Sequence, residues 1–137
     1  SWRHCLPTCV AEFEAFGRDH AVALARLPFT PARRKALLEL SFQNILTAAL
    51  HLREWYGFDI LDRISEEDRV FLHRMFNRRH LFSHCGGKVD QEYLDRTGDA
   101  TVRLNEVVAV KSKDVRRLLA LVRQVATNFL DGFDSIS

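Results

Sequence analysis

The sequence predicts an all-α fold, an antiparallel bundle of four to five helices with a short irregular or β-hairpin excursion between the last two. The main observation is helical spacing of apolar residues in four segments, 7–27, 31–56, 66–84 and 113–130. The second is that residues typical of helix ends bound these segments, such as Pro31 at a first helical position and Gly57 after a last one. The one β-like run is the short stretch at 107–110.

Length and composition are those of one globular domain. A chain of 137 residues can bury a single core, so we expect one domain over residues 1–137. No apolar run approaches about 18 residues and no secretory signal opens the chain, so we expect a cytoplasmic protein with no membrane partner. The chain begins with Ser1 rather than Met, which suggests either a domain excised from a longer protein or residues left over from expression.

The first two predicted helices differ in how much apolar surface they carry. The segment 7–27 starts at Pro7 and has a loose apolar stripe that Gly17 interrupts. The segment 31–56, with Thr30 as its N-cap, is apolar on more than one face. Such a helix is either central in the bundle or covered by a partner chain, and the sequence leaves both open.

The third predicted helix has the clearest ends. Ser65 is followed by three acidic residues, as at an N-cap with negative charge in the first turn, and residues 58–64 form a short turn before it. Gly86 and Gly87 end the helix.

After that helix the apolar period is lost. Residues 88–111 contain turn chemistry, so we expect an ordered excursion there. Ser112 then caps the last helix, 113–130, and Gly132 ends it.

Residues 66–84 divide into two arcs on a helical wheel of about 100° per residue. The apolar arc holds Phe71, Leu72, Met75, Phe76 and Phe82. A narrower polar arc holds Arg69, His73, Asn77, His80 and His84. Arg79 falls in the apolar arc, where an unpaired charge would cost about 3–5 kcal/mol. It must therefore extend to solvent, find an ionic partner, or face a polar seam.

Residues 79–84, Arg-His-Leu-Phe-Ser-His, resemble the signature of HEPN domains, an arginine and a polar residue followed after three positions by a histidine. The Gly86-Gly87-Lys88-Val89-Asp90 continuation is also similar, and the resemblance covers roughly residues 31–130. It implies a HEPN-like bundle, a homodimer, and a metal-independent ribonuclease of toxin–antitoxin or antiviral systems. It also implies that Arg79 and His84 are catalytic and that the products end in a 2′,3′-cyclic phosphate.

The residue types suit that chemistry. RNA carries its own nucleophile, the 2′-hydroxyl beside each phosphodiester. Histidine can accept and donate protons near neutral pH, and arginine can bind two phosphate oxygens while keeping its charge. No metal is required, so we expect no cofactor.

The spacing of the two catalytic candidates raises a geometric problem. Arg79 and His84 are five residues apart, about 140° around a regular helix. Either the helix unwinds at Ser83, or two chains pair so that Arg79 of one meets His84 of the other across a two-fold axis. The resemblance favours the second arrangement.

Four further residues are candidates for substrate binding or for orienting the site. His80 occupies the variable polar position of the motif. Asn77 and Arg78 are candidates for phosphate contacts, and Ser83 for a hydrogen bond to substrate. A solvated helix face is the competing interpretation of Arg78, and an ordinary helix-end residue that of Ser83.

Two other functions compete with the ribonuclease. His80 and His84 are four residues apart with Cys85 adjacent, but no third ligand from another element is evident, so we predict no metal site. A non-catalytic helical module for dimerisation or for RNA or protein binding is the main rival, because fold does not fix function. The expected partners are RNA, a second copy of the chain, and an antitoxin or further domains of a larger protein.

Overall fold

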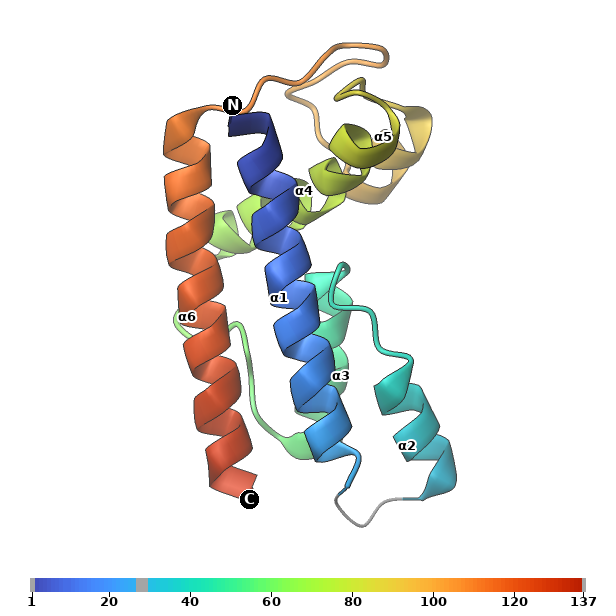
Figure 1. Cartoon of the computed structure of the whole chain (residues 1–137), viewed down its shortest axis with the longest axis vertical. Helices are drawn as coiled ribbons and strands as arrows, with labels where there is room; N and C mark the ends of the chain where they lie inside the picture. The colour runs from blue at the N-terminus through green and yellow to red at the C-terminus, as the bar shows by residue number, and fades with distance from the viewer. Residues whose placement is uncertain (1, 27–29, 137) are drawn as a thin grey trace.

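The computed structural model describes residues 2–26 and 30–136 of the chain (Figure 1). In these residues it contains six helices and no strand, which confirms the all-α class. They are α1 (Trp2–Leu24), α2 (Pro31–Leu38), α3 (Ile45–Tyr56), α4 (Glu66–His84), α5 (Gln91–Thr97) and α6 (Ser112–Ile136).

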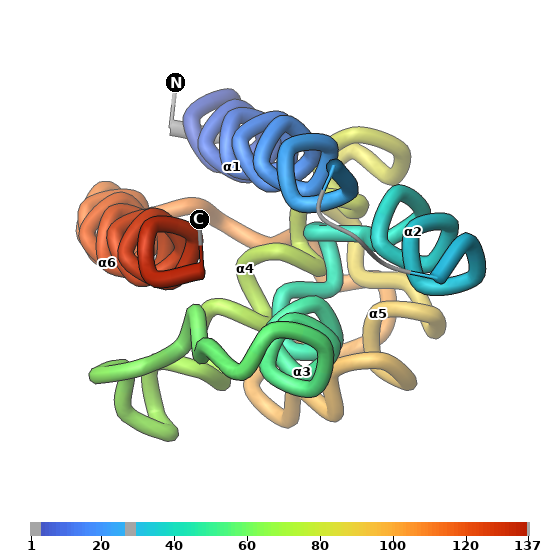
Figure 2. The backbone as a smooth tube through the Cα atoms, turned by 90° about the horizontal axis from the view of Figure 1, so that it is seen from below, coloured from blue at the N-terminus to red at the C-terminus, as the bar shows by residue number. Residues whose placement is uncertain are grey.

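Helix α4 is the element that the others surround. The two long helices α1 and α6 lie side by side, and α4 crosses behind them (Figures 1 and 2). Helix α4 also packs against α3 and α5, and α2 packs against α1. Residues 79–84 therefore lie in the helix that packs against four of the others, α1, α3, α5 and α6.

The centre of the core is a group of aromatic rings from four parts of the chain. The ring of Phe13 in α1 lies 5.7 Å from that of Phe76 in α4 and 6.2 Å from that of Phe42. Phe42 in turn lies 5.9 Å from Phe129 of α6. Edge-on and tilted contacts of this kind add to the free energy gained by burial. They fix the distance between α4 and the α1–α6 pair.

The single helix expected over 31–56 is wrong, because the chain forms two helices separated by residues 39–44. This loop carries Phe42 into the core, where it is 2% exposed. Asn44 then caps α3 by accepting a hydrogen bond from the backbone N–H of Thr47. A straight helix could not bury Phe42 beside α1, so tertiary packing overrides the local helical pattern.

Several predicted helix ends are confirmed and others are corrected. Ser65 caps α4 as expected, and Gly57 ends α3 in the left-handed conformation. Helix α1 begins before Pro7, which lies inside it, and its predicted end at residue 27 falls outside the described residues. Gly132 does not end α6, which continues to Ile136; this glycine lies inside the helix, against the ring of Phe58.

The excursion between α4 and α6 is ordered and contains a helix that the sequence analysis missed, α5. Asp90 caps α5 by accepting a hydrogen bond from the backbone N–H of Tyr93. The expected hairpin is reduced to one antiparallel bridge between Lys88 and Val107. A second, smaller core joins this segment to α4 through Leu81, Val89, Tyr93 and Val108.

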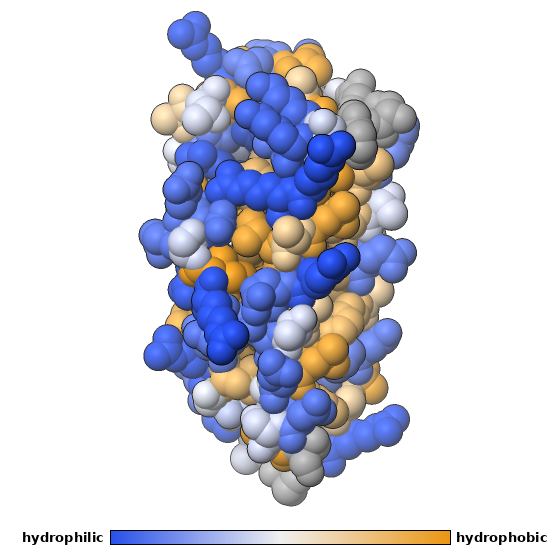
Figure 3. All heavy atoms as spheres, turned by 90° about the vertical axis from the view of Figure 1, so that its left-hand side faces the viewer, coloured by the Kyte–Doolittle hydropathy of each residue, from blue (hydrophilic) through white to orange (hydrophobic). Residues whose placement is uncertain are grey.

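Two surface properties bear on function. An apolar groove of about 720 Å³ runs between α1 and α6, on the side seen in Figure 3. Its walls include Cys9, Phe13, Phe16, Leu119, Val122 and Ala126. In the part of the chain that the structure describes, none of the helices is both long enough and apolar enough to cross a bilayer.

The close contact between Gly17 and Phe42 leaves no room for a side chain at position 17. A Cβ atom on Gly17 would lie 2.5 Å from Cγ of Phe42. Gly17→Ala should therefore lower the free energy of unfolding by about 1–3 kcal/mol, although alanine favours a helix interior by about 1 kcal/mol. Chemical denaturation measures the change. Asp19→Ala, on the exposed side of α1, is the control; equal or greater stability of Gly17→Ala would contradict this packing.

Candidate active site

Four of the six predicted site residues border one cavity. Arg79, His80, Ser83 and His84 line a cavity of about 330 Å³, together with Gln43 from the loop between α2 and α3. Helix α4 is regular through His84 and is capped by Cys85, so the option of a helix unwound at Ser83 is wrong. The cavity thus lies beside the last turns of an intact helix.

Arg79 is held at this cavity by an ion pair. Its Nη1 donates a hydrogen bond of 2.7 Å to Oε1 of Glu14 in α1. The side chains are 27% and 13% exposed, so the pair is partly shielded from water. The arginine in the apolar arc therefore has a carboxylate partner, and a phosphate at this cavity would have to share or replace that partner.

The two histidines of the motif have different surroundings. Their ring centroids are 5.1 Å apart. His84 is exposed at the end of α4. His80 faces the start of α5, with its Nε2 3.4 Å from Oδ2 of Asp90 and 3.9 Å from Oε2 of Glu92. His84 is the better placed of the two for a substrate from solvent.

Arg78 points away from this cavity and into a buried polar cluster. Its Nε donates to the hydroxyl of Tyr93 at 3.0 Å, and its Nη2 donates to Oδ2 of Asp99 at 2.8 Å. The side chain is 12% exposed. These bonds hold α4 against α5, so the structure does not bring Arg78 together with the other motif residues.

Asp99 is the centre of that cluster. It is 2% exposed and accepts hydrogen bonds from Thr101, Tyr93 and Arg78, with Nε of Arg74 at 3.6 Å. Burial alone would raise the pKa of the Asp99 carboxyl, but these hydrogen bonds outweigh it and hold that pKa well below its usual range. Burial and the neighbouring Asp99 raise the pKa of Tyr93 to about 12.

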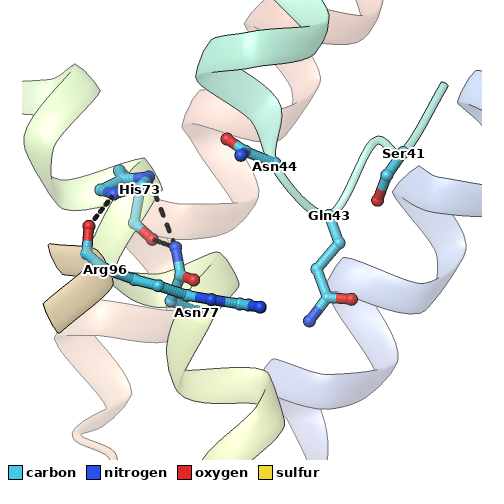
Figure 4. A pocket seen from close by; sticks show the side chains of 6 residues that line it. All are labelled: Ser41, Gln43, Asn44, His73, Asn77 and Arg96. Carbon is cyan, nitrogen blue, oxygen red and sulfur yellow. Dashed lines mark hydrogen bonds between the residues drawn. The ribbon is translucent and has the colours of Figure 1, made fainter. Parts of the chain in front are cut away.

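Asn77 belongs to a second cavity, of about 360 Å³ (Figure 4). Its Nδ2 donates to the carbonyl of His73 at 2.7 Å, and Nε2 of His73 donates to the carbonyl of Arg96 at 3.2 Å. The other lining residues are Ser41, Gln43 and Asn44. Gln43 also lines the first cavity, so the two cavities adjoin.

The polar arc predicted from the helical wheel thus borders two neighbouring cavities, with His73 and Asn77 on one and His80 and His84 on the other. The side of the two cavities that faces α4 was not predicted from the sequence, and it includes Gln43. No local signal identifies this residue, because the segment that carries it reads as the middle of a helix. Only the burial of Phe42 turns that segment into a loop.

At the far end of α4, Cys85 and Asp90 are in contact. The Cys85 thiol donates to Oδ2 of Asp90 at 3.5 Å, and Oδ1 of Asp90 accepts from the backbone N–H of Tyr93. Partial burial and the carboxylates of Asp90 and Glu92 raise the pKa of the Cys85 thiol. The hydrogen bond from Tyr93 lowers the pKa of Asp90.

Comparison of the chain with protein-family models, with curated proteins and with solved structures finds no match.

The cluster around Asp99 predicts a particular loss of stability in acid. The pKa of Asp99 is lower in the folded protein than in the unfolded chain, where it is about 3.9. The ionised carboxylate therefore contributes fully to the free energy of unfolding above about pH 4. This contribution is lost as the pH falls toward the pKa of Asp99 in the folded protein. Asp99→Asn should lower the free energy of unfolding at pH 7 by about 3–5 kcal/mol, since it leaves Arg78 buried without its carboxylate.

The difference between the wild type and Asp99→Asn should shrink below about pH 4. Urea denaturation at several pH values measures it, with Asp131→Asn on the exposed side of α6 as the control. A difference that stays constant down to pH 2 would show that Asp99 is not ionised in the folded protein.

Proposed function

We propose that the chain is a metal-independent endoribonuclease of HEPN type, which cleaves RNA at a composite site formed by Arg79 and His84 in a homodimer. The observation that supports it best is that a permanently charged guanidinium and an exposed imidazole both reach one cavity at the surface of α4, so a two-fold axis beside this cavity would bring the two motifs of a dimer together. These are the groups that cleavage by the 2′-hydroxyl needs.

The reaction assigns one role to each group. His84 accepts the proton of the 2′-hydroxyl while O2′ attacks phosphorus, and the bond from phosphorus to O5′ breaks. Arg79 binds the non-bridging phosphate oxygens and stabilises the charge that builds up on them. The departing O5′ takes a proton from water, and His84 later releases its own proton. The products are a 2′,3′-cyclic phosphate and a 5′-hydroxyl.

The proposal includes a second chain because the side chains of Arg79 and His84 leave α4 in different directions. They leave α4 about 140° apart, and the Arg79 guanidinium is turned toward Glu14 of its own chain. A two-fold axis near this cavity would bring His84 of one protomer to Arg79 of the other. Both motifs would then line one groove.

The second cavity supports binding of a neighbouring base. Gln43, Asn44 and Asn77 offer amide donors and acceptors there, and Arg96 adds a planar cation. Proteins recognise single-stranded RNA by hydrogen bonds to the base edges and by stacking of arginine or aromatic groups. We therefore propose that RNA runs from the first cavity past Gln43 into the second, with Asn77 on a base rather than on a phosphate.

The remaining motif residues have supporting roles in this proposal. Ser83, at the rim of the first cavity, is within reach of bound substrate. His80 orients the end of α4 through the carboxylates at the start of α5. Arg78 orients α4 through Asp99 instead of touching RNA. By the HEPN resemblance, an antitoxin or further domains of a larger protein would control such an enzyme.

A non-catalytic dimerisation module is the alternative, and the apolar groove between α1 and α6 favours it. Leu119, on one wall, is 51% exposed although it is large and apolar. A second copy of the chain could cover such a surface. In that case the motif arginine would serve only to pair with Glu14.

The decisive experiment incubates the purified protein with RNA in EDTA. The wild type should cleave, and His84→Ala and Arg79→Ala should each lower the rate by at least about 100-fold. The 3′ ends of the products should be cyclic phosphates. Arg123→Ala, exposed on α6, is the control that should keep full activity.

Arg79→Ala also leaves Glu14 without its partner, so the double variant Glu14→Gln with Arg79→Ala separates catalysis from stability. It should fold and remain inactive. Activity that survives in the His84 or Arg79 variants would refute the assigned roles. A wild type that forms dimers but never cleaves RNA would favour the dimerisation module.

A further inference from the structure

Three side chains with metal-binding atoms meet where α4 ends and α5 begins. Nε2 of His80 lies 3.4 Å from Oδ2 of Asp90, and Sγ of Cys85 lies 3.5 Å from the same oxygen. The three ligand atoms all lie within 4.8 Å of one another. Asp90 is the ligand from a second element that sequence reasoning did not find.

We propose that His80, Cys85 and Asp90 bind a zinc ion, with Glu92 as the fourth ligand. This site shares His80 and Asp90 with the contacts that orient α4, but it takes neither Arg79 nor His84, the two groups that carry the proposed cleavage. It replaces the prediction that the chain has no metal site.

The spacing of the ligand atoms fits a tetrahedral ion. Bonds of about 2.0–2.3 Å to nitrogen, oxygen and sulfur place neighbouring ligand atoms of a tetrahedral zinc about 3.3–3.8 Å apart. The two separations that involve Oδ2 of Asp90 fall in this range. Oε2 of Glu92 lies 3.9 Å from Nε2 of His80, and the other oxygen of this carboxylate pairs with Arg96 at 2.8 Å, so Glu92 would have to turn toward the other ligands to complete the set.

The backbone holds the ligands in place before any ion binds. Gly86 and Gly87, both at positive φ, reverse the chain directly after Cys85 and return it beside α4. Oδ1 of Asp90 accepts from the backbone N–H of Tyr93, which leaves Oδ2 directed toward the other ligands. Such support of a ligand by a second hydrogen bond is typical of metal sites.

The mixture of ligand types favours zinc over the other common ions. Calcium and magnesium prefer sites made only of oxygen atoms, whereas a thiolate and an imidazole suit zinc. The competing explanation is a plain hydrogen-bonded cluster, in which the thiol of Cys85 keeps its proton and donates it to Asp90. Zinc would displace that proton and bind the thiolate.

A zinc ion here would join the end of α4 to the first turn of α5. His80 would then act on the nuclease site only by orienting the helix, because its Nε2 would be bound to the metal. His84 is not a ligand and remains exposed for substrate.

Titration of the EDTA-stripped full chain with zinc and with cobalt tests the proposal. We expect one zinc ion per chain by elemental analysis and a higher melting temperature in zinc. The cobalt form should show the intense visible bands of tetrahedral coordination and a near-ultraviolet charge-transfer band from the thiolate. Cys85→Ser and Asp90→Asn should each weaken binding by at least about 100-fold.

Cys5→Ser, exposed on α1, is the matched control and should bind zinc like the wild type. Circular dichroism of each metal-free variant establishes that it is folded, and Glu92→Gln tests the fourth ligand by a smaller loss of affinity. Substoichiometric zinc, equal binding by Cys85→Ser, or a cobalt form without the charge-transfer band would overturn the site. None of these results depends on RNA cleavage, so failure of the zinc site and failure of the nuclease remain distinguishable.

Discussion

Two carboxylates from other parts of the chain, the buried Asp99 and the partly buried Glu14, fix the rotation of α4 about its axis, and the rest of the structure depends on that rotation. Arg78 and Arg79 are adjacent, so they leave the helix about 100° apart. Arg78 pairs with Asp99, and Arg79 pairs with Glu14 of α1. A helix that turned by one residue would leave both arginines without their carboxylates, at a cost of about 3–5 kcal/mol for Arg78, the more deeply buried of the two.

This fixed rotation explains how a core helix also supplies a polar surface. With the arginines paired on two sides, Phe76 enters the aromatic core, and the polar arc from His73 to His84 faces the loop between α2 and α3. Gln43 on that loop lines both cavities. One helix therefore provides both core packing and one wall of the two adjoining polar cavities.

Helix ends and helix faces that depend on neighbouring residues can be predicted from the sequence. Features that depend on contacts between residues distant in the sequence cannot. The bounds of α4 follow from Ser65 and the glycine pair, and its two arcs follow from helical periodicity. The break before α3 is different, because it exists so that Phe42 can pack on Gly17. The contact of His80 with Asp90 could not be predicted from the sequence either. It forms because the chain reverses after α4 and Asp90 begins α5, a short helix that was not predicted.

The most direct test of the central claim, that Arg79 and His84 of different protomers form one site, mixes two inactive variants. Arg79→Ala and His84→Ala chains are unfolded together and refolded as one sample. The account predicts about one quarter of the wild-type activity, because half of the randomly paired dimers are mixed and each mixed dimer carries one intact site. A refolded mixture as inactive as either variant alone would contradict it.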